Sequence, residues 1–142
     1  MEYKEFAQRW VKNLMESVDA HLDEEARAEL MEDCGRACAR AGPARVARDC
    51  QGDLDQWLNI LARWHGGEEY VRREGDTVEV LCAECLCVLV KDGPAGLSDT
   101  YCTCSLGWMK DTFEAVVGRP VDVTLVESVK RGSQQCRFVI RL

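Results

Sequence analysis

Cysteine thiols are the side chains of this sequence best suited to chemistry, because thiolates bind soft metal ions and act as nucleophiles. The chain has nine cysteines, and the segment 82–108, CAECLCVLVKDGPAGLSDTYCTCSLGW, holds five of them. Cys85 and Cys87 form one Cys-x-Cys pair, and Cys102 and Cys104 form a second beyond a glycine–proline loop. Zinc and iron–sulfur sites take three or four thiolates from such segments. We therefore expect these four cysteines to bind a metal, with zinc favoured over an iron–sulfur cluster.

Cys82 stands three residues before Cys85, and its role depends on the strand that carries it. Val78, Val80 and Cys82 alternate along one face of a predicted strand, whereas Cys85 and Cys87 have the opposite parity. Either a bulge after Cys82 brings both sets to one side, or Cys82 points away from the other two thiols. Cys82 is therefore a reserve ligand or a core residue.

The same segment suits a second hypothesis, a thiol-dependent enzyme. Ser105 is predicted to cap the following helix, so Cys102 and Cys104 would lie just before its first turn. Unpaired amide groups and the helix dipole stabilise a thiolate at such a position. A hydrolase or a dithiol redox protein would use Cys102 or Cys104 as its nucleophile. The alternative is that both thiols only pack at a crowded helix–strand junction.

The remaining cysteines are predicted to pack in the core. Cys34 and Cys38 lie one helical turn apart and could share a metal, but they continue an apolar stripe from Leu30, which favours burial. Cys50 is most simply a buried thiol. Cys136 lies on the apolar face of the last predicted strand, which again favours the core.

Glu127 is the carboxylate that the strand pattern singles out. The alternation that begins at Val121 would point it inward, and a buried carboxylate needs a cation or a hydrogen-bonding partner. A bulge after Val126 would instead turn it outward. His21 and His65 lie at the ends of predicted helices, where surface or capping roles are expected.

The elements that must position these side chains fall into a helical half, 1–67, and a ββαββ half, 68–142. Apolar spacing and capping residues predict helices at 2–21, 23–42, 43–50 and 53–66. Alternation predicts strands at 69–73, 77–90, 121–127 and 136–142, with a helix from Ser105 to Gly118 between the second and third strands. We expect a single α+β domain in which N-terminal helices precede an antiparallel sheet unit.

Composition limits the classes of partner. The 142 residues carry a net charge of −7, and 46% of them are hydrophobic, which indicates a folded chain. Nucleic-acid binding needs clustered Lys and Arg, whereas the short basic runs here are interrupted by acidic residues. The start, MEYKEFAQRW, lacks the features of a signal peptide, and no apolar run is long enough to span a membrane. We expect a cytoplasmic protein with reduced thiols.

The C-terminal third resembles the closing segment of the 4-vinyl reductase domain family. The resemblance rests on Gly107-Trp108, the GRPVDV run and Gly132-x-x-x-Cys136-x-Phe138. It implies a small-molecule-binding domain, such as the sensory modules of aromatic-responsive bacterial regulators, with helices before a ββαββ unit. The segments DCGRAC and YCTCSLGW are also similar to a family of small, uncharacterised, cysteine-rich bacterial and archaeal proteins.

The first resemblance also implies a zinc site made by an acidic residue, a cysteine upstream of the hairpin glycine, and a cysteine that matches Cys136. Ser128 stands where the upstream cysteine is expected, and Leu125 lies near the expected acid, with Glu127 as a substitute. The four thiols of the segment 82–108 are therefore the preferred ligands here.

These features lead to one functional expectation. The chain is predicted to be a small-molecule-binding or sensory domain in which the cysteine cluster holds zinc beside an apolar pocket lined from the helical half. Its partner would be a small-molecule ligand, with neither nucleic acid nor membrane involved. A homodimer formed through exposed aromatic residues such as Tyr3 or Trp108 is a further expectation.

Overall fold

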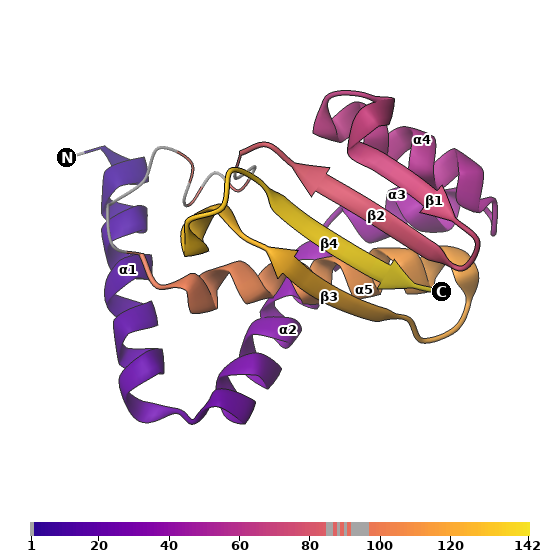
Figure 1. Ribbon diagram of the computed structural model, residues 1–142. Coiled ribbons are helices and arrows are strands. Elements are labelled where there is room, and N and C mark those ends of the chain that lie inside the picture. The colour runs from indigo at the N-terminus through magenta and orange to yellow at the C-terminus, as the bar shows by residue number, and fades with distance from the viewer. Residues whose placement is uncertain (1, 85–86, 88, 90, 92–96) are drawn as a thin grey trace.

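The structure is a computed structural model that describes residues 2–84, 87, 89, 91 and 97–142 (Figure 1). Its fold class is α+β, as predicted. The helices are α1 (Tyr3–His21), α2 (Glu24–Arg40), α3 (Pro43–Asp49), α4 (Leu54–His65) and α5 (Cys104–Val117), with 3-10 turns η1 (Glu68–Tyr70), η2 (Asp99–Thr103) and η3 (Val129–Arg131). The strands are β1 (Val71–Glu74), β2 (Thr77–Cys82), β3 (Asp122–Glu127) and β4 (Cys136–Arg141).

The four strands form an antiparallel sheet in the order β1-β2-β4-β3. The chain passes from β2 through α5 to the edge strand β3, and β4 then returns between β2 and β3. In the β2–β4 pair, Val80 lies opposite Phe138 and Cys82 lies opposite Cys136. Figure 1 shows that β2 and β3 end, and β4 begins, at the same end of the sheet.

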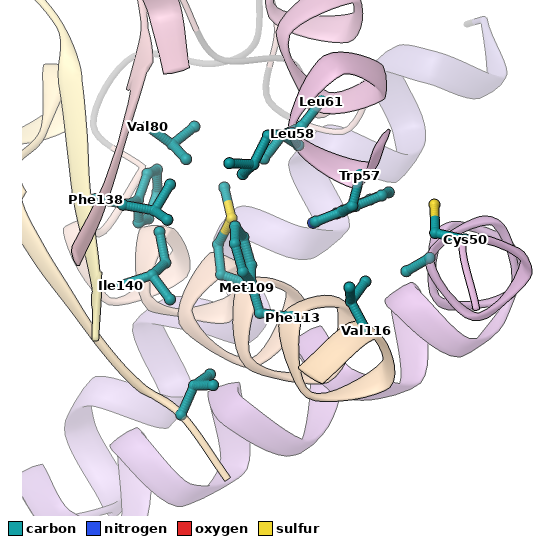
Figure 2. Close-up of a cluster of buried hydrophobic side chains, with 13 residues drawn as sticks. Cys50, Trp57, Leu58, Leu61, Val80, Met109, Phe113, Val116, Phe138 and Ile140 are labelled. Atoms are coloured by element: carbon teal, nitrogen blue, oxygen red, sulfur yellow. The ribbon is translucent and has the colours of Figure 1, made fainter. Parts of the chain in front are cut away.

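One face of the sheet packs on α5 and α4. Met109 and Phe113 of α5 lie against Val80 and Phe138 of the sheet, and Trp57 of α4 closes the far side of this core (Figure 2). Trp57 and Phe113 are fully buried, with their rings 6.3 Å apart in an edge-to-face arrangement. Large side chains thus fill the space between helices and sheet.

Several helix ends follow directly from capping residues. The Asp23 carboxylate accepts a hydrogen bond from Ala26 N at 2.8 Å, and the Asp53 carboxylate accepts one from Gln56 N at 3.1 Å. Gly66 ends α4 with a φ of 110°, a left-handed conformation that glycine adopts at little cost. These boundaries confirm the predicted helices, and the observed helix α3 confirms the turn predicted at 43–50.

Helices α2 and α5 cross at two glycines. A Cβ atom added at Gly35 would collide with the backbone carbonyl oxygen of Cys104, and one added at Gly107 would collide with that of Glu32. The colliding atoms belong to the backbone, so side-chain rotation cannot relieve the overlap. The two helices therefore depend on glycine at both positions to approach this closely.

Charged side chains flank this crossing. Arg36 of α2 donates to Glu114 at 2.8 Å and to Asp111 at 3.2 Å, both on α5, and Lys110 of α5 donates to Glu32 at 2.9 Å. The hydrogen bond from Lys110, strengthened by the positive charges of Lys110 and Arg36, holds the pKa of Glu32 below its usual range. This half-buried network fixes the register of α2 on α5.

The apolar stripe predicted for α2 is wrong. Met31, Gly35 and Ala39 form the buried face, whereas Cys34 and Cys38 are exposed to solvent. The stripe rule selects the largest apolar side chains, but Gly35 and Ala39 on this face are small, and at Gly35 the partner backbone leaves no room for a side chain. Cys34 and Cys38 therefore do not pack in the core.

The strand predicted at 77–90 is shorter in the structure, because β2 ends at Cys82 and Ala83 and Glu84 lie in a bend. The strand predicted at 69–73 begins two residues later, after the turn η1. Among the described residues, no helix is both long enough and apolar enough to cross a membrane.

Candidate functional site

Of the four predicted metal ligands, the structure describes three. Cys87 and Cys104 both pack against a small apolar cluster whose buried members come from α1, α2 and the start of the η2 segment: Met15, Val18, Met31 and Leu97. Cys87 Sγ lies 3.2 Å from the Tyr101 hydroxyl, with which it shares a hydrogen bond. Cys102 is half-buried in η2. Cys85 lies outside the described residues.

The start of α5 differs from the prediction. Ser105 is not the N-cap: the helix begins at Cys104, Thr103 has helical backbone angles, and the Ser105 hydroxyl donates to the Cys102 carbonyl. The turn η2 runs into α5, and the Cys104 amide already donates within that turn. The open end of this helical stretch is at Ser98, whose hydroxyl accepts from Thr100 N at 3.2 Å.

This arrangement removes the reason for assigning a nucleophile to Cys102 or Cys104. The prediction placed both thiols before a helix with unpaired amides, but both now lie inside a continuous helical stretch. Within the residues that the structure describes, no three Cys, His, Asp or Glu side chains converge as a metal site. Zinc ligation by the four-cysteine set, which includes Cys85, stays a prediction.

A second group of chemically active side chains lies at the end of the sheet. Cys82 Sγ is 3.3 Å from His65 Nδ1, at the C-terminal end of α4. Cys136 lies directly opposite Cys82 on the neighbouring strand, and its Sγ accepts a hydrogen bond from Val129 N at 3.4 Å. All three side chains are half-buried. His65 was expected to be a surface or capping residue; it lies half-buried at the end of α4, and its ring contacts Cys82.

Burial lowers the pKa of His65, so the imidazole is neutral at pH 7. A neutral ring 3.3 Å from a sulfur can accept the thiol proton. The predicted strand parity already placed Cys82 and Cys136 on core-facing strand faces. Residue spacing did not predict the strand register that places these two cysteines opposite each other. It also did not predict that the end of α4 would bring His65 to Cys82.

A bulge settles the two alternatives for Glu127. The β3–β4 register shifts between Leu125 and Glu127, and Glu127 then lies opposite Arg137, with its Oε1 3.9 Å from Arg137 Nε. The carboxylate is thus on the outer face of the sheet, away from the core. Continuing the shifted register places Ser128 beside Cys136, and Ser128 is only 1% exposed.

The Ser128 hydroxyl is therefore a buried polar group on the core side of the sheet. Among the described residues, its oxygen has no hydrogen-bond partner. The resemblance to 4-vinyl reductase domains implies a metal-binding cysteine here and an acid near Leu125. A hydroxyl and a leucine side chain do not provide that ligand set, so we assign no metal to this position.

Two surface cavities lie near the sheet. A cavity of about 620 Å³ at the sheet end is lined by Tyr70, Ala83, Glu127, Gly132, Ser133, Gln134 and Gln135. Ala83 and Gln135 are the chain neighbours of Cys82 and Cys136. A smaller cavity of about 290 Å³, whose wall includes Asn59 and Arg73, lies between α4 and β1.

Cys50 is a different kind of thiol. It is buried in the main core, and its Sγ donates to the Val46 carbonyl at 3.5 Å. Burial, together with the negative charges of Asp53 and Asp49, raises its pKa. Cys50 is therefore a packing residue, as predicted, and provides an unreactive reference for the other thiols.

The fold has a counterpart among solved structures. The chain is similar to the phenol-responsive sensory domain of the transcription activator PoxR, solved with phenol, with a TM-score of 0.60 and 19% identity. The match covers 99% of this chain and 74% of that chain. At this identity the likeness establishes the fold alone. No curated protein matches the sequence.

A family model matches the sequence over residues 1–142, including the DCGRAC and YCTCSLGW segments. It is described as a family of unknown function (DUF6144). The resemblance to 4-vinyl reductase domains stays a prediction from short motifs. The chain belongs to the DUF6144 family.

Proposed function

We propose that this chain is a small-molecule-binding sensory domain whose ligand occupies the 620 Å³ cavity at the sheet end. The observation that carries the proposal is the shared fold, which in PoxR forms a phenol-responsive sensory domain and which extends over 99% of this chain. The cavity has the size of a typical small-molecule site. It also adjoins the cysteine-rich segment, because Ala83 belongs to both.

The cavity wall indicates the chemistry of the ligand. Tyr70 offers an aromatic ring, whereas Gln134, Gln135 and Glu127 offer amide and carboxylate groups. Such a wall suits a small aromatic compound with one or two hydroxyl groups, because the ring stacks and the hydroxyl groups donate to the carboxylate and amide oxygens.

Thermal unfolding with phenol and catechol as probes tests the ligand proposal. A ligand at about 100 times its Kd adds about 2.7 kcal/mol to the unfolding free energy, so Tm rises by several degrees. Tyr70→Ala should abolish the rise. Asn59→Ala, in the smaller cavity, is the matched control and should retain it. A rise of equal size in Tyr70→Ala, or none in the parent protein, refutes the proposal for this ligand class.

The second part of the proposal is a structural zinc ion held by Cys85, Cys87, Cys102 and Cys104. Its support is that Cys87 and Cys104 pack on the same apolar cluster although 17 positions separate them. Bound zinc would tie the 82–91 segment to the start of α5, since thiolate ligation crosslinks the chain.

Metal content tests this part independently of the ligand. We expect about one zinc per chain in the protein as isolated, lost in Cys87→Ser and Cys104→Ser. The double variant Cys34→Ser/Cys38→Ser removes the exposed thiols of α2 and should keep the zinc. Less than about a tenth of an equivalent in the parent protein contradicts zinc ligation.

A further inference from the structure

The group formed by His65, Cys82 and Cys136 has a geometry suited to reversible thiol oxidation. Cys82 and Cys136 are direct partners in the antiparallel register, and both face the helix layer. Directly opposed residues of antiparallel strands have Cα atoms about 4.5 or 5.5 Å apart, and both values fall within the range that a disulfide spans.

His65 distinguishes the two thiols. Its Nδ1 is 3.3 Å from Cys82 Sγ, whereas Cys136 Sγ receives the amide N–H of Val129. One thiol thus has a base within proton-transfer distance, and the other is held by a backbone donor. This is the pairing of an attacking cysteine with a resolving cysteine.

The pair lies at the end of the sheet that carries the 620 Å³ cavity. The 620 Å³ cavity is walled by Ala83 and Gln135, which follow Cys82 and precede Cys136 in the chain. Both cysteines are half-buried, in contrast to Cys50, which is enclosed in the core. Neither cysteine is part of the cavity wall, so a small disulfide compound would reach the pair through the exposed fraction of these two residues.

We propose that Cys82 and Cys136 form a redox-active dithiol in which His65 activates Cys82 toward low-molecular-weight disulfides such as glutathione disulfide. The Cys82 proton passes to His65 Nδ1, and the sulfur attacks one sulfur of the oxidant. The oxidant S–S bond breaks, a mixed disulfide forms on Cys82, and the released thiolate takes the proton from His65.

Cys136 completes the reaction. Its sulfur attacks Cys82 Sγ, the mixed disulfide breaks, and the Cys82–Cys136 bond forms. The second oxidant thiolate leaves with the Cys136 proton. In sum, two protein thiols are oxidised, and one disulfide of the oxidant is reduced to two thiols. The step closes a bond between β2 and β4 next to the ligand cavity.

Peptide mapping after exposure of the full chain to glutathione disulfide tests the proposal. A glutamate-specific protease cuts after Glu79 and Glu84, which isolates Cys82 from Cys85 and Cys87, and after Glu127, which isolates Cys136. We expect a linked product of the 80–84 and 128–142 peptides. In Cys136→Ser the reaction should stop with glutathione on Cys82.

His65→Asn tests the base, because asparagine places an amide atom near the Nδ1 position but accepts no proton. We expect the rate of Cys82 modification to fall roughly tenfold, while the rate at exposed Cys34 stays unchanged. Urea-denatured protein should show no difference between the parent and His65→Asn, which would show that the rate difference requires the folded site.

Two outcomes overturn the proposal: modification of Cys82 no faster than that of Cys34, or an unchanged Cys82 rate in His65→Asn. The experiment repeated in Cys87→Ser/Cys104→Ser should give the same linked peptides. That arm keeps the result independent of whether the zinc proposal holds.

Discussion

The imidazole of His65 couples the end of helix α4 to strand β2, and its burial makes folding sensitive to pH. A ring that is neutral in the folded state and has a lowered pKa resists protonation, whereas the unfolded chain protonates near pH 6.5. Above that pH both states are neutral, and His65 contributes no pH dependence. As the pH falls through 6.5 toward the folded pKa, the unfolded state binds more protons and stability is lost.

We therefore predict that His65→Asn flattens the pH dependence of the unfolding free energy below about pH 6.5. Urea unfolding at several pH values measures the slope. His21→Asn, which removes an exposed imidazole from α1, is the matched control and should retain the parent slope. Asp19 and Glu32 have lowered pKa values, so their effect falls in a separate window below about pH 4. Equal slopes in the parent and His65→Asn would contradict the prediction.

For single residues, the sequence indicated which face of the sheet some side chains occupy, but it did not indicate which residues they contact. Strand alternation placed Cys82 and Cys136 on core-facing strand faces, and the structure agrees. It could not pair them, because the register depends on how β4 returns between β2 and β3. The bulge in β3 was one of two alternatives for Glu127, since alternation alone does not reveal an extra residue.

Among the elements, the contact between α2 and α5 is the one on which the helical half most depends. Its two glycines bring backbone against backbone, and the Arg36 and Lys110 ion pairs lie beside the contact. Sequence patterns located both helices, with the Asp23 cap and the Gly118 end as predicted. They failed on the buried face of α2, because apolar stripes report large side chains and this crossing excludes them.

We predict that Gly35→Ala and Gly107→Ala each lower the unfolding free energy by about 3 kcal/mol, since the new methyl group meets main-chain atoms that cannot rotate away. Gly42→Ala is the control, because nothing lies within 4 Å of an added Cβ there and its φ of −170° is outside the left-handed region. It should cost no more than about 1 kcal/mol. Urea denaturation measures all three. A loss at Gly35 no larger than at Gly42 would mean that the helices adjust more freely than their backbone contact implies.

For the whole molecule, the main distinction is between a filled core and a projecting arm. The helices α4 and α5 and the sheet enclose Trp57 and Phe113, whereas Figure 1 shows α1 and the start of α2 extending beyond the sheet. The predicted amphipathic helix is present, but Phe6, Trp10 and Leu14 of its apolar stripe are exposed, and Tyr3 is 95% exposed. Composition and spacing predicted the α+β architecture. Composition and spacing could not predict that the apolar stripe of α1 would lie outside the core. The same stripe is expected whether the helix packs on its own chain or on another molecule.

The exposed apolar stripe of α1 identifies the surface that the expected homodimer would use. Trp108, one of the two aromatic residues considered for pairing, is partly buried and packs against the core, with its ring 6.5 Å from that of Trp57. The exposed stripe of α1 is therefore the remaining surface for pairing, and Trp10, near its centre, is 57% exposed. We predict that light scattering gives the mass of two chains, and that Trp10→Glu gives the mass of one with unchanged circular dichroism. Val126→Glu, at an apolar position on β3 that is 44% exposed, should leave the dimer intact. Burying four large apolar side chains between two copies would favour association. A parent protein with the mass of one chain at every concentration would therefore show that the stripe does not pair two copies.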